Sequence, residues 1–220
     1  VRTELTSDRA AYLYIGAATA VIFAVFGYFL GRQADRLAQL SETDPLTDLL
    51  NARGFSARLH SEIRRARRYR QPLSLLFLDL DGLKTINDRY GHRAGSDAIK
   101  QVGTVIHAEL RETDTGARWG GDEFTILAPN TRSGAALTFA ERVRARIAEL
   151  RVDWPLTVSI GVATLEPEGN GMTEDAPGLL RAADAAMYHA KRCGKNAVVA
   201  ADMQDAEHFG LQARRLQPEA

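Results

Sequence analysis

The stretch TGARWGGDEFTILAP, residues 115–129, decides the fold. It holds two strand-like runs, TGARW and EFTILAP, on either side of Gly120 and Gly121. A glycine pair between two such runs is typical of a tight β-hairpin turn. Two acids, Asp122 and Glu123, follow the glycines directly. The sequence therefore predicts an antiparallel hairpin with carboxylates at its turn.

A second segment with carboxylates lies upstream of the hairpin. The apolar run LSLLFLDLD follows Pro72 and has the length of a buried strand. Asp79 and Asp81 alternate along this run, so we expect them on one face at the strand end. If the hairpin lies beside this strand, three or four carboxylates converge, which is costly unless cations neutralise them. Carboxylates without His or Cys favour Mg²⁺ or Mn²⁺ over zinc, and two such cations suit nucleotidyl transfer.

Helical and strand-like patterns alternate through the rest of this region. We expect helices near residues 83–89, 94–110, 134–150 and 177–192, and further strands at TVSIGVA and NAVVA. The predicted fold class is α/β, with a central, mostly antiparallel sheet flanked by helices. The predicted domain covers residues 44–200, and residues 201–220 form a polar tail.

The N-terminal segment predicts one transmembrane helix. Residues 10–31 carry no charge, and 22 helical residues reach about 33 Å, enough to cross the bilayer core. Residues 1–9 would form a stub outside the cytoplasm, and residues 32–43 a helical linker. The alternatives are a buried core helix and a signal peptide, but the run is long for a signal peptide. The flanking arginines do not set the orientation, because both sides carry two.

Composition excludes some partners. The 28 Lys and Arg residues are balanced by 28 Asp and Glu residues, so no overall positive field exists to bind a nucleic acid polymer. The basic stretch at residues 61–70 is typical of a solvated helix face, with lipid headgroups as the alternative partner. The single cysteine, Cys193, fits a reducing compartment.

Five motifs resemble those of the GGDEF diguanylate cyclases. RWGGDEF resembles the family signature, and DPLTDLLN, FLDLDGLKTINDRYGHRAG, SIGVA and AADAAMYHAKRCGKN resemble the other motifs, in the family's order. The resemblance implies a palm-like nucleotidyl cyclase fold and a homodimer in which each subunit binds one GTP. Each 3′-hydroxyl would attack the α-phosphate of the other GTP, which gives cyclic di-GMP and pyrophosphate.

The resemblance also implies roles for individual residues. Asp79, the Leu80 carbonyl and Glu123 would hold the magnesium, and Asp122 would help to deprotonate the attacking hydroxyl. Lysines would neutralise the phosphates, and polar residues would contact the nucleoside. The substrate-binding positions implied in this way are Gly82, Leu83, Lys84, Asn87, His92, Ser96, Lys191 and Lys195.

Ser96 departs from the family pattern. Most members carry an aspartate there, which accepts hydrogen bonds from the N1–H and amino groups of guanine. A serine hydroxyl can donate or accept, so adenine should be rejected less strongly. A promiscuous subgroup of the family carries serine at this place and makes cyclic AMP-GMP. We therefore expect ATP to be used beside GTP, unless Asp97 or a water molecule restores guanine selectivity.

A feedback site is also implied. Arg111 and Asp114 have the RxxD spacing of the family's inhibitory site, which binds the cyclic dinucleotide product. Arginine can clamp phosphate or stack on guanine, and aspartate can accept hydrogen bonds from the base edge. Arg142 is a candidate to complete the site from a second subunit.

Several other functions remain open at this point. The chain could be a catalytically degenerate receptor for cyclic di-GMP, a strictly GTP-specific diguanylate cyclase, a cyclase with a monomeric product, or a membrane adaptor. Because GTP and ATP are cytosolic, the catalytic domain is expected in the cytoplasm of a bacterium. The chain would then be a single-pass protein of the inner membrane.

Overall fold

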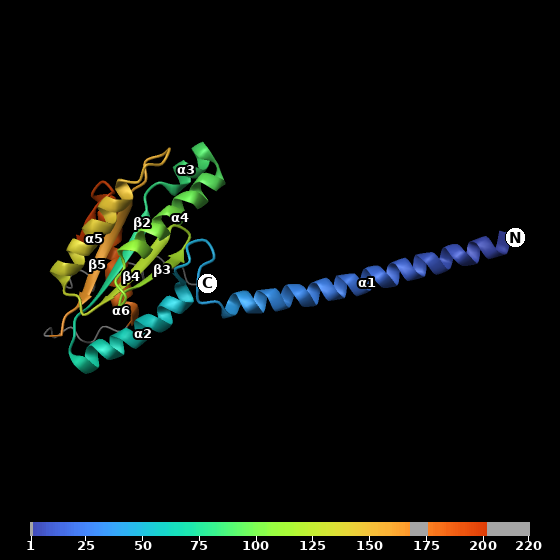
Figure 1. Cartoon of the computed structure of the whole chain (residues 1–220), viewed down its shortest axis with the longest axis horizontal. Coiled ribbons are helices and arrows are strands. Elements are labelled where there is room, and N and C mark those ends of the chain that lie inside the picture. The colour runs from blue at the N-terminus through green and yellow to red at the C-terminus, as the bar shows by residue number, and fades with distance from the viewer. Residues whose placement is uncertain (1, 168–175, 202–220) are drawn as a thin grey trace, which may run out of the picture. The chain divides into compact units, whose positions relative to one another are not determined.

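The structure is a computed structural model that describes residues 2–167 and 176–201 (Figure 1). The chain divides into two compact units, Val1–Ser41 and Glu42–Ala220. The first unit consists of helix α1, Arg2–Leu40. The second holds the sheet and every other helix of the described residues.

Helix α1 contains the apolar stretch that the sequence predicts to span a membrane. Its window Tyr12–Gln33 is 22 residues long, has a mean hydropathy of 2.0 and is not buried within the chain. Because none of this window is buried, α1 is not a core helix of the described chain. Length and composition therefore make α1 a candidate span, and a signal sequence near an N-terminus shares both properties.

The second unit is built on a mixed six-stranded sheet with the order β1-β3-β4-β2-β5-β6. The three central pairings, β3 with β4, β4 with β2 and β2 with β5, are antiparallel. Both edge pairings, β1 with β3 and β5 with β6, are parallel, which the prediction of a mostly antiparallel sheet left out. The strands are β1 Leu50–Asn51, β2 Leu73–Leu80, β3 Thr115–Gly120, β4 Glu123–Pro129, β5 Val158–Leu165 and β6 Val198–Ala200.

Helices cover both faces of the sheet (Figure 1). The apolar residues of α2 and α6 pack on one face, and those of α4 and α5 pack on the other. Helix α3 packs mainly against α4. The bounds are α2 Ala52–Tyr69, α3 Leu83–Tyr90, α4 His92–Glu109, α5 Ser133–Ala148 and α6 Ala176–Arg192. The prediction of an α/β domain with flanking helices is thus confirmed.

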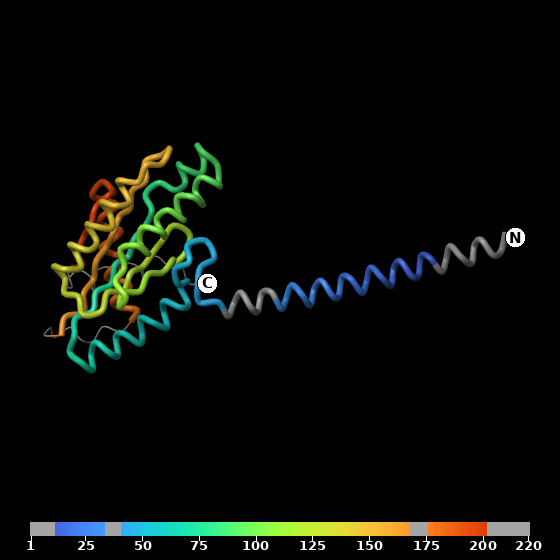
Figure 2. The backbone as a smooth tube through the Cα atoms, in the orientation of Figure 1, coloured from blue at the N-terminus to red at the C-terminus, as the bar shows by residue number. Residues whose placement is uncertain are grey.

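Strand β2 lies at the centre of the sheet, between β4 and β5. Figure 2 shows the path of the chain through the domain. All eight of its residues are buried. Side chains alternate along a strand, so Leu75 and Phe77 pack toward α2 and α6, while Leu76 and Leu78 pack toward α4 and α5. Burial on both faces explains why β2 is a continuous apolar run.

Gly161 allows α6 to pack directly on the sheet. A Cβ atom at this position of β5 would collide with the Ala183 carbonyl oxygen and the Met187 amide nitrogen of α6. Both atoms belong to helix backbone, so neither can move aside as a flexible side chain could. The SIGVA segment therefore fixes the distance between α6 and the sheet.

The substitution Gly161→Ala should lower the free energy of unfolding by about 1 to 3 kcal/mol, because the added methyl group overpacks this contact. Urea denaturation followed by circular dichroism measures the effect. Gly134→Ala is the matched control, since Gly134 lies in α5 with nothing within 4 Å of the added Cβ atom. That control should raise stability slightly, by about 0.5 to 1 kcal/mol. Equal stability of the two variants would contradict the packing argument.

Candidate active site

The register of β2 against β4 brings two acidic residues face to face. Asp79 and Glu123 are direct partners in this antiparallel pairing, so their side chains lie on the same face. The Leu80 amide donates a hydrogen bond to the Asp122 carbonyl oxygen over 3.1 Å, which extends the pairing to the turn. Gly121 adopts a left-handed conformation with φ of 49° in that turn. The predicted convergence of the strand and the hairpin is therefore observed.

Arg118 ties the hairpin turn to the start of the domain. Its Nη2 and Nε atoms donate to the Gly121 carbonyl oxygen over 2.8 and 3.0 Å. Its Nη1 atom lies 3.1 Å from Asp44 Oδ2. The other oxygen of Asp44 accepts from the amides of Leu46 and Thr47, which fixes the DPLT turn. Arg118 thus links the opening motif to the GGDEF turn through an ion pair on one side and hydrogen bonds on the other.

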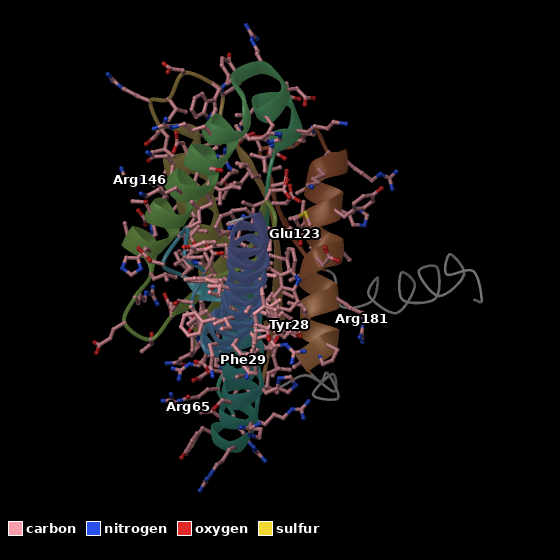
Figure 3. All side chains as sticks on the ribbon, turned by 90° about the vertical axis from the view of Figure 1, so that its right-hand side faces the viewer. Tyr28, Phe29, Arg65, Glu123, Arg146 and Arg181 are labelled. Atoms are coloured by element: carbon pink, nitrogen blue, oxygen red, sulfur yellow. The ribbon has the colours of Figure 1, made fainter. Side chains whose placement is uncertain are left out.

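Lys191 extends from α6, which packs on this face of the sheet, to the acidic pair. Its Nζ atom lies 2.6 Å from Asp79 Oδ2, and the Asp79 residue is only 6 % exposed. A charge-assisted bond of this kind compensates part of the cost of burying a carboxylate. Figure 3 shows Glu123 beside α6. The structure thus brings Asp79, Glu123 and Lys191 together.

The protein environment disfavours the charged forms of Asp79 and Glu123. Burial raises the pKa of Asp79, the charge of Asp122 raises it further, and the Lys191 ammonium opposes both effects. Burial also raises the pKa of Glu123, and the charges of Asp79, Asp184 and Asp122 add to this shift. Ionised carboxylates in such a position favour the binding of cations.

Asp184 is a member of this cluster that the sequence analysis missed. Burial raises the pKa of its carboxyl group, and its charge acts on Glu123. Asp184 lies seven residues before Lys191 on α6, so two helical turns place both on one face. The sequence shows that Asp184 and Lys191 share a face of α6. It does not show that this face meets the end of β2 and β4, so Asp184 could not be assigned to the site from the sequence.

Asp81 lies on the same face as Asp79, and its charge adds to the increase that burial causes in the pKa of Asp79, but its carboxylate is bound by neighbouring hydroxyl groups. Its carboxylate accepts hydrogen bonds from Thr157 Oγ1 over 2.9 Å and from Ser159 Oγ over 2.8 Å. Within residues 2–167 and 176–201, no group of three or more Asp, Glu, His or Cys side chains could hold one ion. The expected convergence of three or four carboxylates on one spot is therefore reduced to a facing pair with further acids near it.

The predicted nucleoside-binding residues lie on the α3–α4 hairpin. Gly82, with φ of 76°, begins α3, and a Cβ atom at Gly95 of α4 would collide with the Asn87 side chain. Ser96 follows Gly95 and donates its hydroxyl to the His92 carbonyl oxygen over 3.1 Å. Asn87 and Ser96 thus lie close to each other. The remaining predicted residues of this hairpin are Leu83, which packs against the core, and the exposed Lys84 and His92.

Lys195 lies in a tight turn after α6. Gly194, Lys195 and Asn196 all have positive φ angles, of 111°, 66° and 46°. The Lys195 amide donates to the Ala190 carbonyl oxygen over 3.2 Å, which closes the end of the helix. Lys195 therefore emerges from the same helix end that carries Lys191.

The predicted inhibitory residues lie at the far end of α4. The Arg111 amide donates to Asp114 Oδ2 over 3.0 Å, which forms a compact turn. Arg111 lines a pocket of about 250 Å³ together with Arg65, which is labelled in Figure 3. Arg142 Nε lies 2.6 Å from Glu109 Oε2, two residues before Arg111. Arg142 of the same chain therefore lies next to this turn.

Glu123→Gln should raise the melting temperature of the metal-free protein at pH 7 by about 1 to 3 °C, because it removes a carboxylate that burial and neighbouring acids disfavour. The pKa of Glu123 is higher in the folded state than in the unfolded state, so the folded protein binds a proton at higher pH than the unfolded chain does. Once Glu123 is protonated, the wild type no longer carries the unfavourable charge. The advantage of the variant should therefore shrink as pH falls toward the unfolded-state pKa, about 4.3. Calorimetry in EDTA measures this difference, with Glu112→Gln as the control, since Glu112 is exposed and lies in a turn outside the helices. An advantage that grows toward low pH would contradict it.

Comparison with known proteins agrees with this geometry. The sequence profile of the family described as diguanylate cyclase, GGDEF domain, matches residues 41–197. The response regulator PleD of Caulobacter vibrioides is 36% identical over 178 residues, which cover 78% of this chain and 38% of PleD. The diguanylate cyclase TpbB of Pseudomonas aeruginosa is 41% identical over 176 residues, which cover 77% of this chain and 39% of TpbB. The chain thus spans less than two fifths of either protein.

A solved structure shows the same fold. The GGDEF domain of DgcB from Caulobacter crescentus, determined in complex with c-di-GMP, superimposes with a TM-score of 0.69 at 31% sequence identity. The match covers 73% of this chain and 93% of that domain. Profile, sequence and fold agree over the unit that carries Asp79, Glu123 and Lys191. This chain belongs to the GGDEF diguanylate cyclase family.

Proposed function

We propose that this chain is a cyclic-dinucleotide synthase that condenses two GTP molecules into cyclic di-GMP, with pyrophosphate as the second product. The facing pair of Asp79 and Glu123 next to Lys191 is the observation that carries this proposal. It supplies carboxylate oxygens for a cation and an ammonium group for phosphate in one place. Its position at the GGDEF turn agrees with the family to which the chain belongs.

The chemistry of the site fits Mg²⁺ or Mn²⁺. Asp79, Glu123 and the Leu80 carbonyl are oxygen donors, and Mg²⁺ in nucleotide enzymes is usually bound by one or two carboxylates together with substrate phosphates. Two facing carboxylates are therefore sufficient when a triphosphate provides the other ligands. When bound, the cation would neutralise the triphosphate and polarise the α-phosphate.

The chain's own residues have distinct roles in this proposal. Lys191 and Lys195, at the end of α6, together with Lys84 of α3, neutralise the triphosphate. Asp122, beside the facing pair, accepts the proton of the attacking 3′-hydroxyl. The Asp79 ion pair holds Lys191 in the site before the nucleotide binds.

Two subunits are needed for the complete reaction. Each chain carries one such site, and each of the two nucleotides must provide both a hydroxyl and an α-phosphate. A two-fold symmetric dimer meets this requirement because each site faces its copy. The exposed apolar stretch of α1 supports a membrane anchor for each chain. Because GTP is cytosolic, the catalytic domain would lie in the cytoplasm and the N-terminus outside the inner membrane.

Ser96 supports relaxed base choice. Its hydroxyl proton is donated to the His92 carbonyl oxygen, so the oxygen keeps lone pairs that can accept from a base. Guanine offers N1–H and an amino group, and adenine offers its own amino group. A single neutral acceptor distinguishes these bases less than a carboxylate would, so the enzyme also makes cyclic AMP-GMP from GTP and ATP.

Incubation of the purified chain with equal GTP and ATP and with Mg²⁺ tests both parts of the proposal. Wild type should yield cyclic di-GMP and cyclic AMP-GMP, and Ser96→Asp should reduce the mixed product about 5- to 150-fold, the range expected for one discriminating hydrogen bond. Chromatography with mass spectrometry identifies the products. Asp97→Asn is the control, because it tests whether the neighbouring acid sets base choice instead.

Each alternative gives a different result in this experiment. Cyclic di-GMP alone from both wild type and Ser96→Asp identifies a strictly GTP-specific diguanylate cyclase. A monomeric cyclic nucleotide identifies a cyclase of another type. Binding of cyclic di-GMP without release of pyrophosphate identifies a degenerate receptor, and the cyclase proposal then fails.

The turn of Arg111 and Asp114 is proposed as a product-binding inhibitory site. The neighbouring pocket, lined by Arg111 and Arg65, supports the binding of an anionic dinucleotide, although Glu62 also lines it and lies 3.9 Å from Arg65. Arg142 would join this site from a second subunit after leaving Glu109.

Arg111→Ala should weaken product inhibition at least about 10-fold, since a charge-assisted clamp on phosphate is lost. Initial rates with added cyclic di-GMP give the half-inhibitory concentration. The initial rate without added product should stay close to wild type, because Arg111 lies apart from Asp79 and Glu123. Unchanged inhibition in Arg111→Ala would contradict the assignment.

A further inference from the structure

Asp81 holds the turn that follows α6, although it lies next to the proposed metal site. We propose that Asp81 is a positioning residue: its carboxylate fixes the turn of residues 193–196 and thereby places Lys191 and Lys195 for the triphosphate. This inference rests on the proposed function for its role in phosphate binding. The lock on the turn is independent of that function.

Strand β5 and the residue that precedes it, Thr157, fix the orientation of the Asp81 carboxylate. Thr157 Oγ1 donates to Oδ2 over 2.9 Å, and Ser159 Oγ donates to Oδ1 over 2.8 Å. The Asp81 amide donates to the Thr157 carbonyl oxygen over 2.9 Å, so the backbone is held as well. Each carboxylate oxygen of Asp81 thus accepts one hydrogen bond from a hydroxyl group, apart from any bond to the turn.

The turn binds to this oriented carboxylate through its backbone. The Asn196 amide donates to Asp81 Oδ2 over 3.0 Å, across 115 residues of sequence. Lys195 and Asn196 both lie in the left-handed region, which asparagine tolerates but which a lysine occupies at a cost. An ionised acceptor gives a stronger hydrogen bond than a neutral one and offsets this cost. Asp81 therefore stabilises a backbone conformation that the sequence of the turn disfavours.

Other contacts fix the turn on its remaining sides. The Lys195 amide bonds to Ala190, and the Ile160 amide donates to the Ala197 carbonyl oxygen over 2.9 Å. Arg144 Nη1 donates to Asn196 Oδ1 over 2.8 Å. The acceptors in these bonds are neutral, although the Arg144 donor is charged, whereas Asp81 is a charged acceptor for a backbone amide of the turn. The turn is therefore held between β5, α5 and the residue that follows β2.

The hydrogen bonds of Asp81 give it a different role from Asp79, although both side chains lie on one face of the sheet. Oδ2 of Asp81 receives two donors, Thr157 Oγ1 and the Asn196 amide, which occupy the lone pairs of that oxygen. Asp79 instead faces Glu123 and Lys191. Two acids separated by one residue thus have different tasks: Asp79 faces the cation and the nucleotide, and Asp81 holds the lysines that meet the phosphates.

Steady-state kinetics of the full chain in detergent micelles test the functional part. Asp81→Asn removes the charge and replaces one of the two acceptor oxygens with an amino group, which cannot accept a hydrogen bond, so at least one of the three donors loses its acceptor. The KM for GTP should rise about 5- to 50-fold, while kcat stays within about 3-fold of wild type and the Mg²⁺ concentration for half activation does not move. Asp153→Asn removes the same charge from an exposed loop position and should leave the kinetics unchanged.

Thr157→Val is a milder variant that keeps the carboxylate and removes one of its donors. It should raise the KM for GTP less than Asp81→Asn does. A large fall in kcat with a shifted Mg²⁺ requirement in Asp81→Asn would make Asp81 part of the cation site and overturn the proposal. An unchanged KM in Asp81→Asn would also overturn it.

Amide hydrogen exchange tests the lock without any nucleotide. The amides of residues 194–197 should exchange at least about 10-fold faster in Asp81→Asn than in wild type or Asp153→Asn. Equal exchange rates would overturn the proposed lock even if the enzyme is active. If wild type makes no cyclic dinucleotide, the proposed function fails, and faster exchange in Asp81→Asn still establishes Asp81 as the residue that positions the turn.

Discussion

The register between β2 and β4 is the constraint on which the site depends. It places Asp79 directly opposite Glu123, and a slip of one residue would turn one of the two side chains to the opposite face. The register is strongly specified because β2 is buried on both faces, with leucines and Phe77 committed to two different cores. The same apolar run that forms the core therefore fixes the geometry of the acids at its end. Arg118 extends this order from the hairpin turn to the opening motif.

The acidic side chains of the site lower the stability of the fold and serve the binding of ligands. Several acids lie where burial and mutual repulsion disfavour their charged forms, and Lys191 offsets only part of this cost. Such a cluster is expected where cations and phosphates bind, since ligands supply the missing compensation. Helix α6 is central to this balance, because Gly161 lets it approach the sheet closely and because it carries both Asp184 and Lys191. Asp81 then secures the turn at the end of this helix.

Sequence patterns predicted the parts of this structure that local chemistry controls. The glycine turn, the buried strand β2 and the helices follow from turn residues and periodicity, and the facing of Asp79 and Glu123 follows once the hairpin lies beside β2. The parallel edges were not predicted, because β1 and β6 have two and three residues and pair with strands distant in sequence. Alternation correctly placed Asp81 on the face of Asp79, since Ser159, which lies opposite Asp79, donates to the Asp81 carboxylate. The pattern could not show that Thr157, Ser159 and Asn196 bind both oxygens of that carboxylate. Asp184 was missed because only the packing of α6 brings it to Glu123.

The central claim is that Asp79 and Glu123 hold a divalent cation together with the triphosphate, while Lys191 serves the phosphates. A crystal structure with Mn²⁺ and a non-reactive GTP analogue, with anomalous scattering to locate the metal, tests it most directly. We expect a manganese peak bound by both carboxylates and by phosphate oxygens, with Lys191 Nζ moved from Asp79 Oδ2 to the triphosphate. Manganese bound elsewhere, or an intact pair of Lys191 and Asp79 beside a bound nucleotide, would contradict this account.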